Sequence, residues 1–335
     1  MKIVLAGSVS FSRHTLERLL AHGANVAGVL GLDPSASNGV SDYSNLEEVA
    51  AAANVPYRSY VKINAPEIVE QVRAWAPDLM FVVGLSQLVH DDIMNIPPMG
   101  SIGFHPTRLP EGRGRAPVAW LTWDAKPGAA TFFVLEKEAD AGAIFVQEPY
   151  DVPHGSYAED VIAAVRAAID RGLDRWLPKL LAGEWNPVPQ DEALASFWGK
   201  RAAEDGWIDW MKPADEIARL VRTASHPYPG AYTYLRGRKL MIWRARVVDL
   251  PFRGVPGRVL HTDSEGFLVQ TGDGVLKVEQ HELTGDAPGR VAVGMRLGFV
   301  VEDEIAKLRE RLAVIEEKLG SHDATGKPPK AAKDL

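Results

Sequence analysis

The stretch Leu79-Met80-Phe81-Val82-Val83 is an uninterrupted apolar run. A strand whose side chains alternate between apolar and polar has one face in water, whereas a strand without alternation is buried on both faces. This run follows a helical pattern at 65–74, and earlier segments repeat the same order of strand and helix. Strands that alternate with helices predict a parallel sheet with helices on both faces.

The alternation extends outward from residues 79–83 in both directions. Strands are expected at 1–6, 25–30, 55–60, 101–104 and 129–135, and further helices at 15–21, 46–53 and 157–180. We therefore predict an α/β fold in which residues 1–183 form a Rossmann-like, mostly parallel sheet.

The turn after the first strand contains Gly7 but does not read GxGxxG, so a dinucleotide site is only weakly indicated. Its serines, Ser8 and Ser10, lie where a helix N-terminus can bind an anion. A plain strand-to-helix turn explains the segment equally well.

A different pattern begins after residue 183. Residues 184–204 carry two prolines and are expected to be a linker. Residues 205–300 contain one helical pattern, at 214–224, and then short strands at 239–248, 257–261, 267–271 and 275–279. Short strands separated by glycine-containing turns predict a small, OB-like β-barrel domain.

The segment 301–320 predicts an amphipathic helix. Its apolar residues stand at 301, 305, 308, 312, 315 and 319, with spacings that alternate between four and three. This is the a/d pattern of a coiled coil, but it lasts for fewer than three heptads. The helix either packs on its own domain or forms a homodimer contact. Residues 321–335 are polar and are expected to be disordered.

The composition limits the possible partners and the compartment. The chain has 335 residues, a formal charge of −7 and no cysteine. An acidic balance disfavours a general nucleic-acid binder, and the absence of cysteine excludes disulfides and thiolate metal sites. No stretch has the ~18 apolar residues of a membrane helix, and no signal peptide is evident. These features fit a cytoplasmic protein that does not bind a membrane.

The densest polar cluster follows the strand at 101–104 and reads His105-Pro106-Thr107-Arg108-Leu109-Pro110-Glu111-Gly112-Arg113-Gly114-Arg115. Open α/β sheets bind ligands at the carboxyl ends of their strands. His105 is therefore the first candidate for catalysis. A second cluster, residues 136–142, follows the next strand, and its Asp140 is flanked by small residues. An aspartate near a histidine orients the ring and raises its basicity.

These residues resemble a known family. HPTRLPEGRGRAP, at 105–117, and ADAGAI, at 139–144, are similar to the signature loops of the folate-dependent formyltransferases. DGWIDWMKPADEI, from residue 205, and HPYPGAYTYLRGRKLMIWRA, from residue 226, resemble the C-terminal barrel of the family members that act on tRNA or 4-amino-arabinose. The resemblance covers roughly residues 1–300.

The resemblance implies a role for each of several residues. His105 would be the catalytic acid and base, and Asp140 would orient it. The pterin of 10-formyltetrahydrofolate, the co-substrate, would contact the loop and backbone formed by Leu85, Ser86, Gln87, Leu88, Glu138, Ala139 and Asp140. The acceptor amine would enter beside Ser8, Ser10, Thr107, Arg113 and Arg115. For the two arginines, folding of the loop is an equal alternative. No metal is required.

One position departs from the family. Its usual motif is N-x-H, and the asparagine donates a hydrogen bond to the developing oxyanion, but this chain has Gly103 there. Loss of one oxyanion donor costs ~10²–10³ in rate. Three explanations compete. Gln87 or Thr107 supplies the hydrogen-bond donor instead, or the space left by the missing side chain admits an unusual acceptor. The third is that the enzyme hydrolyses 10-formyltetrahydrofolate.

The region after the second strand bears on the acceptor. Residues 31–43 contain no Lys or Arg, where the tRNA enzymes usually carry a basic insertion. Because binding of a phosphate backbone requires such residues, methionyl-tRNA is disfavoured. A nucleotide-linked amino sugar is the first expectation for a small-molecule acceptor, and an amine of a siderophore or other specialised metabolite is the second.

Overall fold

The computed structural model describes residues 1–85, 87–285, 289–299 and 301–323. Its N-terminal part contains a seven-stranded sheet in the order β3-β2-β1-β4-β5-β7-β8. The strands are β1 (Lys2–Gly7), β2 (Asn25–Leu32), β3 (Tyr57–Tyr60), β4 (Leu79–Val83), β5 (Ser101–His105), β7 (Gly128–Val134) and β8 (Ile144–Tyr150). The first five are parallel, as the apolar runs predict, and β7 runs antiparallel to both β5 and β8.

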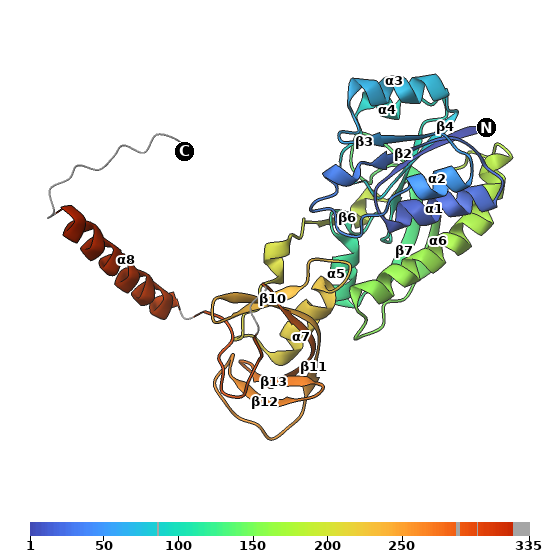
Figure 1. Cartoon of the computed structure of the whole chain (residues 1–335). Helices are drawn as coiled ribbons and strands as arrows, with labels where there is room; N and C mark the ends of the chain where they lie inside the picture. Colours follow the sequence, from blue (N-terminus) through green and yellow to red (C-terminus); the bar gives the residue numbers. More distant parts are fainter. Residues whose placement is uncertain (86, 286–288, 300, 324–335) are drawn as a thin grey trace.

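Helices cover both faces of this sheet (Figure 1). One apolar core joins one face to α1 (Ser10–Ala21), α2 (Glu47–Ala52), α5 (Pro117–Asp124) and α6 (Ala158–Leu181). A second core joins the other face to α3 (Pro66–Trp75) and α4 (Asp91–Met94). Burial on both faces explains why β1, β2, β4, β5 and β7 show no polar alternation, whereas the edge strands β3 and β8 carry polar residues.

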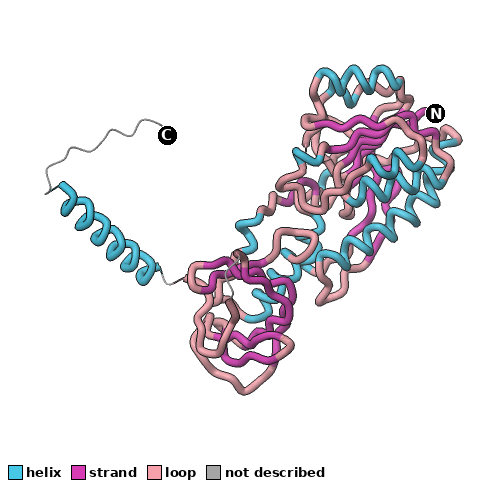
Figure 2. The backbone as a smooth tube through the Cα atoms, viewed as in Figure 1, coloured by secondary structure: helices cyan, strands magenta, loops and turns pink. Residues whose placement is uncertain are grey.

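The C-terminal part contains a separate antiparallel sheet with its own core, and the two groups of strands stand apart in Figure 2. Its order is β10-β11-β14-β13-β12. The strands are β10 (Ala231–Leu235), β11 (Arg238–Val248), β12 (Val259–Asp263), β13 (Gly266–Gln270) and β14 (Val275–Leu283), and α7 (Ala214–Ala224) packs on them. This separate antiparallel sheet domain agrees with the predicted fold class, and within the described ranges no ladder joins β10 to β12.

The terminal helix α8 (Val301–Asp323) extends three residues beyond its predicted end. The expected tail from residue 324 lies outside the described residues, as does Ser86. In the part of the chain that is described, no helix is long and apolar enough to cross a membrane.

The stretch expected to be a linker packs against the N-terminal domain. Short helical turns occupy Glu192–Leu194 and Ala203–Gly206, and β9 (Phe197–Trp198) pairs in parallel with β6 (Arg113–Gly114) of the polar loop after β5. We call residues 187–201 the strap, because this segment lies across the loops that carry the predicted catalytic residues.

Candidate active site

His105 is the last residue of β5 and is only 6% exposed. Its Nε2 lies 2.8 Å from the carbonyl oxygen of Gly112, which only accepts hydrogen bonds. Nε2 therefore donates, and Nδ1 is the nitrogen that can exchange a proton during a reaction. The turn from Pro106 to Gly112 thus fixes both the ring and its tautomer.

Asp140 approaches His105 from a loop that doubles back along the sheet. Because β7 is antiparallel, Val134 at its end lies opposite Ile102, near the start of β5. The following loop returns so that Asp140 Oδ2 is 3.7 Å from His105 Nδ1. The same oxygen accepts a 2.8 Å hydrogen bond from the backbone N–H of Gly114. The two residues of the predicted His–Asp pair face each other, although the antiparallel strands β5 and β7 end at opposite edges of the sheet.

Gln190 of the strap holds the Asp140 loop in place. Its Nε2 donates to the carbonyl oxygens of Asp140 and Gly142, both at 2.7 Å. Its Oε1 accepts from Arg113 Nη2 at 2.8 Å. One amide side chain therefore connects the two loops that carry the site. The sequence analysis missed Gln190 because Pro187 and Pro189 marked the segment as a linker.

Arg113 is fully buried, and its guanidinium forms hydrogen bonds within the protein. Besides Gln190, its guanidinium contacts Glu192 through two hydrogen bonds of 2.6 and 2.9 Å. The prediction that Arg113 binds the substrate is corrected here, because the side chain has no exposed surface to offer; the alternative, folding of the loop, fits its contacts. Arg115 is exposed, and its backbone N–H donates to Trp198 O at 3.0 Å.

Two further contacts fix the strap to the polar loop. The backbone N–H of Gly112 donates to Ser196 Oγ at 2.9 Å, and that of Arg113 donates to Ser196 O at 2.9 Å. Gly114 has a φ of +108°, and a Cβ at this position would lie 2.6 Å from Trp198 O. Only glycine fits so close to the strap in this conformation.

The first turn is closed to ligands, which corrects the prediction for Ser8 and Ser10. Ser8 is completely buried, and its hydroxyl donates to Gly84 O at 2.7 Å. Ser10 Oγ contacts Asp42. Ser12 Oγ accepts from the backbone N–H groups of Ser8 and Val9. The plain strand-to-helix turn is thus the interpretation that fits.

The predicted folate loop lies at the end of β4. Gln87 is bonded at both ends of its amide, since Ile63 N–H donates to Oε1 at 2.9 Å and Nε2 donates to Val61 O at 2.8 Å. This arrangement disfavours Gln87 as an oxyanion donor. Leu85 is partly buried, Leu88 is 71% exposed, and Glu138 and Ala139 are exposed beside Asp140.

The space beside Gly103 is filled by an aromatic ring. Gly103 pairs with Phe133 across β5 and β7, and a Cβ on Gly103 would lie 2.6 Å from the Phe133 ring. Phe133 is 1% exposed. The missing side chain therefore does not open room for an unusual acceptor. Phe133, which the sequence analysis did not single out, takes the place of the side chain.

Thr107 is the remaining candidate for the missing donor. It is 1% exposed, and no residue in the described ranges forms a hydrogen bond with its Oγ1. A buried hydroxyl without a partner costs ~1–3 kcal/mol. A catalytic role is one explanation for such a group, which Thr15 and Thr223 also contain. Thr107 lies two residues after His105 on the same loop.

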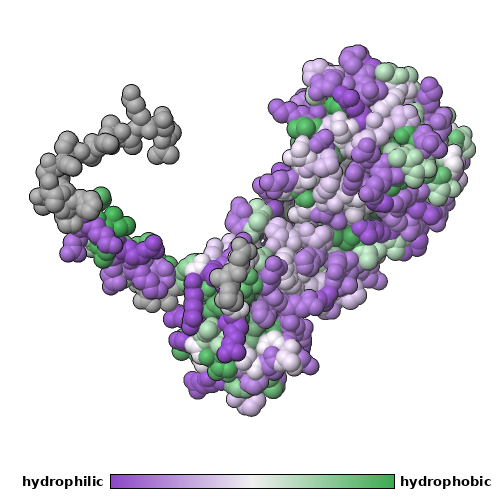
Figure 3. Space-filling view, viewed as in Figure 1, coloured by the Kyte–Doolittle hydropathy of each residue, from purple (hydrophilic) through white to green (hydrophobic). Residues whose placement is uncertain are grey.

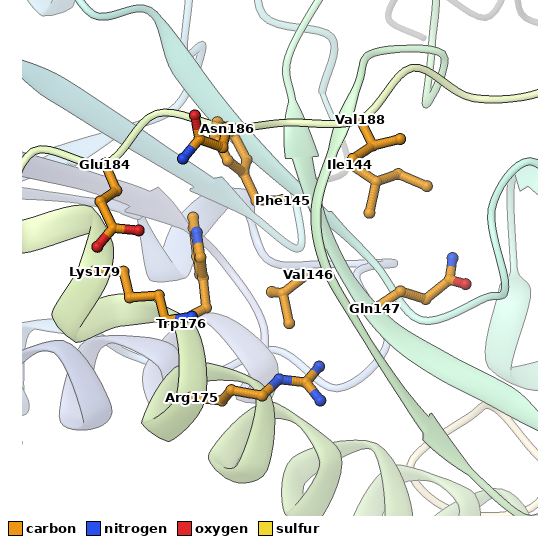
Figure 4. Close-up of a pocket in the computed structure, with 10 residues that line it drawn as sticks. All are labelled: Ile144, Phe145, Val146, Gln147, Arg175, Trp176, Lys179, Glu184, Asn186 and Val188. Atoms are coloured by element: carbon orange, nitrogen blue, oxygen red, sulfur yellow. The ribbon is translucent and has the colours of Figure 1, made fainter.

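A cleft lies away from this pair. It has a volume of about 400 Å3 between the edge of β8 and the end of α6 (Figure 4). Its lining includes Trp176, Arg175, Lys179 and Glu184, and none of the predicted site residues. No group of three or more metal-ligating side chains occurs in the residues that the structure describes.

The structure is an α/β fold in which buried His105, at the end of β5, faces the partly buried Asp140. The chain belongs to the formyl transferase family. The family model for the formyl transferase domain matches residues 1–177, and the model for its C-terminal domain matches residues 200–292.

Solved structures share the fold at low sequence identity. HypX from Aquifex aeolicus, in complex with tetrahydrofolic acid, is 17% identical with a TM-score of 0.60 over 83% of this chain, which spans only 43% of that protein. An N-formyltransferase from Helicobacter canadensis, in complex with folinic acid and dTDP-3-aminofucose, is 15% identical with a TM-score of 0.59, covering 83% of this chain and 99% of that one. Methionyl-tRNA formyltransferase from Clostridium thermocellum is 19% identical with a TM-score of 0.52, covering 74% and 94%.

Proposed function

We propose that this chain transfers the formyl group of 10-formyltetrahydrofolate to the primary amine of a nucleotide-linked amino sugar. The observation that carries the proposal is the His105–Asp140 pair, whose facing atoms are 3.7 Å apart in a formyl transferase fold. Folate compounds bound to HypX and to the Helicobacter canadensis enzyme support the donor. The chain's lack of cysteine fits the reducing cytoplasm, where we place the reaction.

The proposed chemistry needs one proton relay. The acceptor nitrogen attacks the formyl carbon, which becomes tetrahedral, and the carbonyl oxygen becomes an oxyanion. His105 Nδ1 takes the proton that the amine loses, and the Asp140 carboxylate stabilises the imidazolium. The bond between the formyl carbon and N10 then breaks, and His105 returns the proton to N10. The products are the formamide of the acceptor and tetrahydrofolate.

Substrate placement follows from the exposed groups near the pair. We propose that the pterin contacts the loop that carries Leu85 and Leu88 and the backbone of Glu138 and Ala139. The exposed apolar side chain of Leu88 suits a flat ring system. Arg115 is an exposed cation on the polar loop after β5, where its backbone pairs with the strap, and it is proposed to contact an anionic part of the acceptor.

The dTDP-3-aminofucose bound to the Helicobacter canadensis enzyme supports an amino-sugar acceptor. The absence of Lys and Arg from residues 31–43 argues against methionyl-tRNA. An amine of a siderophore or another specialised metabolite is the alternative acceptor of the same class.

The test measures deformylation of 10-formyltetrahydrofolate with and without a panel of amino-sugar nucleotides and other amines. We expect turnover that depends on one sugar nucleotide and yields its formamide. His105→Gln should lose about 10²–10⁴-fold in turnover while retaining folate binding by calorimetry. His154→Gln, at an exposed histidine, is the matched control and should stay active. Full activity of His105→Gln would refute the assignment.

Hydrolysis of 10-formyltetrahydrofolate is the second candidate, and Gly103 is the observation that favours it. With Phe133 in place of an asparagine, the site lacks the donor that the family uses in transfer. A hydrolase would release formate at the same rate whether or not an amine is present. Transfer would instead consume the amine in equal amount with the folate.

A further inference from the structure

The terminal helix α8 exposes a continuous apolar stripe. Figure 1 shows the helix lying away from both domains, and Figure 3 shows apolar side chains open on its surface. The exposed fractions are large for every member of the stripe: Val301 61%, Ile305 43%, Leu308 61%, Leu312 55%, Ile315 52% and Leu319 68%. The alternative that this helix packs on its own domain is therefore not what the structure contains.

The charged residues beside the stripe identify what fits it. With Ile305 and Leu312 at heptad position a, and Leu308 and Ile315 at d, the flanking g positions are Glu304 and Arg311 and the e positions are Arg309 and Glu316. In a parallel coiled coil each g residue faces the e residue five positions later on the partner helix. A second copy would therefore place Glu304 against Arg309 and Arg311 against Glu316. All of these pairs attract.

The antiparallel arrangement is disfavoured by the same charges. Full overlap of the stripe would place position 305 opposite 315 and position 308 opposite 312. In that register g faces g and e faces e, so Arg309 would meet the Arg309 of the other copy and Arg311 the Arg311 of the other copy, while Glu304 would meet Lys318. Like charges across a helix interface reduce its stability.

We propose that α8 pairs with α8 of a second copy of this chain in a parallel, in-register, two-stranded coiled coil. Ile305 at a with Leu308 at d is the order that favours two strands, whereas the next heptad has the reverse order. A seam of fewer than three heptads binds weakly, so the dimer should dissociate on dilution. The proposal does not depend on the substrate or on the reaction.

Sedimentation of the full-length protein over a series of concentrations tests the assembly. We expect a reversible monomer–dimer equilibrium. Leu312→Glu, which keeps a good helix former in place but puts a charge in the seam, should abolish the dimer. Ala313→Glu adds the same charge at the neighbouring b position and should remain dimeric. A monomer at every concentration, or a mass of three or more copies, would overturn the proposal.

Single cysteines test the direction of pairing, because the natural chain has none. Ile305→Cys should form a disulfide-linked dimer under mild oxidation, since the two 305 positions face each other only in the parallel register. Ala313→Cys, outside the seam, should not. If Ile305→Cys cross-links only when mixed with Ile315→Cys, the helices are antiparallel and the proposal fails.

A charge exchange gives an independent test of register. Arg309→Glu should weaken the dimer because it faces Glu304 of the partner. Combining it with Glu304→Arg should restore the dimer in the parallel register. In the antiparallel register Glu304→Arg would face Lys318, so the double variant would be weaker still, which contradicts parallel pairing.

Discussion

Two residues bear on the His105–Asp140 pair: Thr107, which the sequence analysis named, and Gln190, which it missed. Thr107 holds a buried hydroxyl that has no hydrogen-bond partner in the described ranges. Gln190 connects the loops of Asp140 and Arg113 through its side-chain amide. The first is a candidate for contact with the reacting atoms, and the second acts only through its neighbours.

Thr107→Val should separate catalysis from stability. If Oγ1 donates to the oxyanion, turnover should fall about 10²–10³-fold. Stability should be unchanged or slightly raised, because an unpaired buried hydroxyl is replaced by a methyl group. Initial rates and denaturant unfolding are the measurements.

Thr122→Val is the matched control, since its hydroxyl donates to Val118 O at 2.7 Å within α5. That change should cost about 1 kcal/mol of stability and leave turnover intact. Equal turnover in Thr107→Val and the natural protein would remove Thr107 from the site.

Gln190→Leu should impair the site by releasing the Asp140 loop. A displacement of about 1 Å at the pair is enough for a loss of ~10²-fold in kcat. In the proposed relay Asp140 stabilises the imidazolium form of His105, so the pH profile of kcat should shift as well. Gln280→Leu, at an exposed glutamine on β14, is the control. A variant with lower stability but an unchanged pH profile would show that Gln190 is merely structural.

At the scale of elements, most of the sheet could be predicted from the sequence. The apolar runs located β1, β2, β4 and β5 because burial on both faces leaves a direct pattern, whereas β3 is a partly exposed edge strand. The direction of β7 could not be predicted in this way, because an antiparallel strand buried on both faces has the same composition as a parallel one. The sequence analysis also missed β8, α5 and β10.

The candidate site was predicted in part for a related reason. His105 and Asp140 stand in motifs, so their pairing could be expected. Ser8, Ser10 and Arg113 are polar residues in the right loops, and nothing in the sequence says that their hydrogen bonds are made inside the protein. The Gln190 contacts join residues about 50 and 77 positions apart and leave no local pattern.

The C-terminal sheet should show an acid-sensitive element. Lys277 is 5% exposed and donates to both carboxylate oxygens of Asp263 at 2.7 Å. The Lys277 hydrogen bonds lower the pKa of Asp263, with a smaller contribution from the backbone N–H of Glu265. The folded state therefore holds this carboxylate ionised more strongly than the unfolded chain does.

The sign of the pH dependence follows from this direction. The stabilisation is present above the unfolded pKa of about 4 and is lost as the pH falls through the lowered folded value. Asp263→Asn should lower the denaturation midpoint at neutral pH and flatten the decline below pH ~4. Chemical unfolding of the natural protein and of Asp263→Asn across acidic pH measures this decline. An equal decline of the midpoint with pH in both proteins would contradict the ion pair.

At the scale of the whole molecule, the N-terminal and C-terminal domains meet at a contact that includes polar and aromatic groups. Tyr157 at the start of α6 exchanges hydrogen bonds of 3.2 Å with the backbone of Ala245 on β11. The guanidinium groups of Arg201 and Arg219 lie 5.4 and 5.7 Å from the centre of the Trp123 ring, near the end of α5. The contact joins the domains while leaving each with its own interior.

The strap changes where this protein can be divided and recombined. The N-terminal domain was expected to end near residue 183. Gln190, Glu192 and Ser196 of the strap nevertheless form hydrogen bonds with the loops of that domain. A chimera that joins foreign sequence at residue 183 would exchange the strap together with the C-terminal domain. A junction after Arg201 keeps it. For gene fusion and for exchange of modules between relatives, the working unit is therefore longer than the folded domain, and its last residues come from what looks like connecting chain.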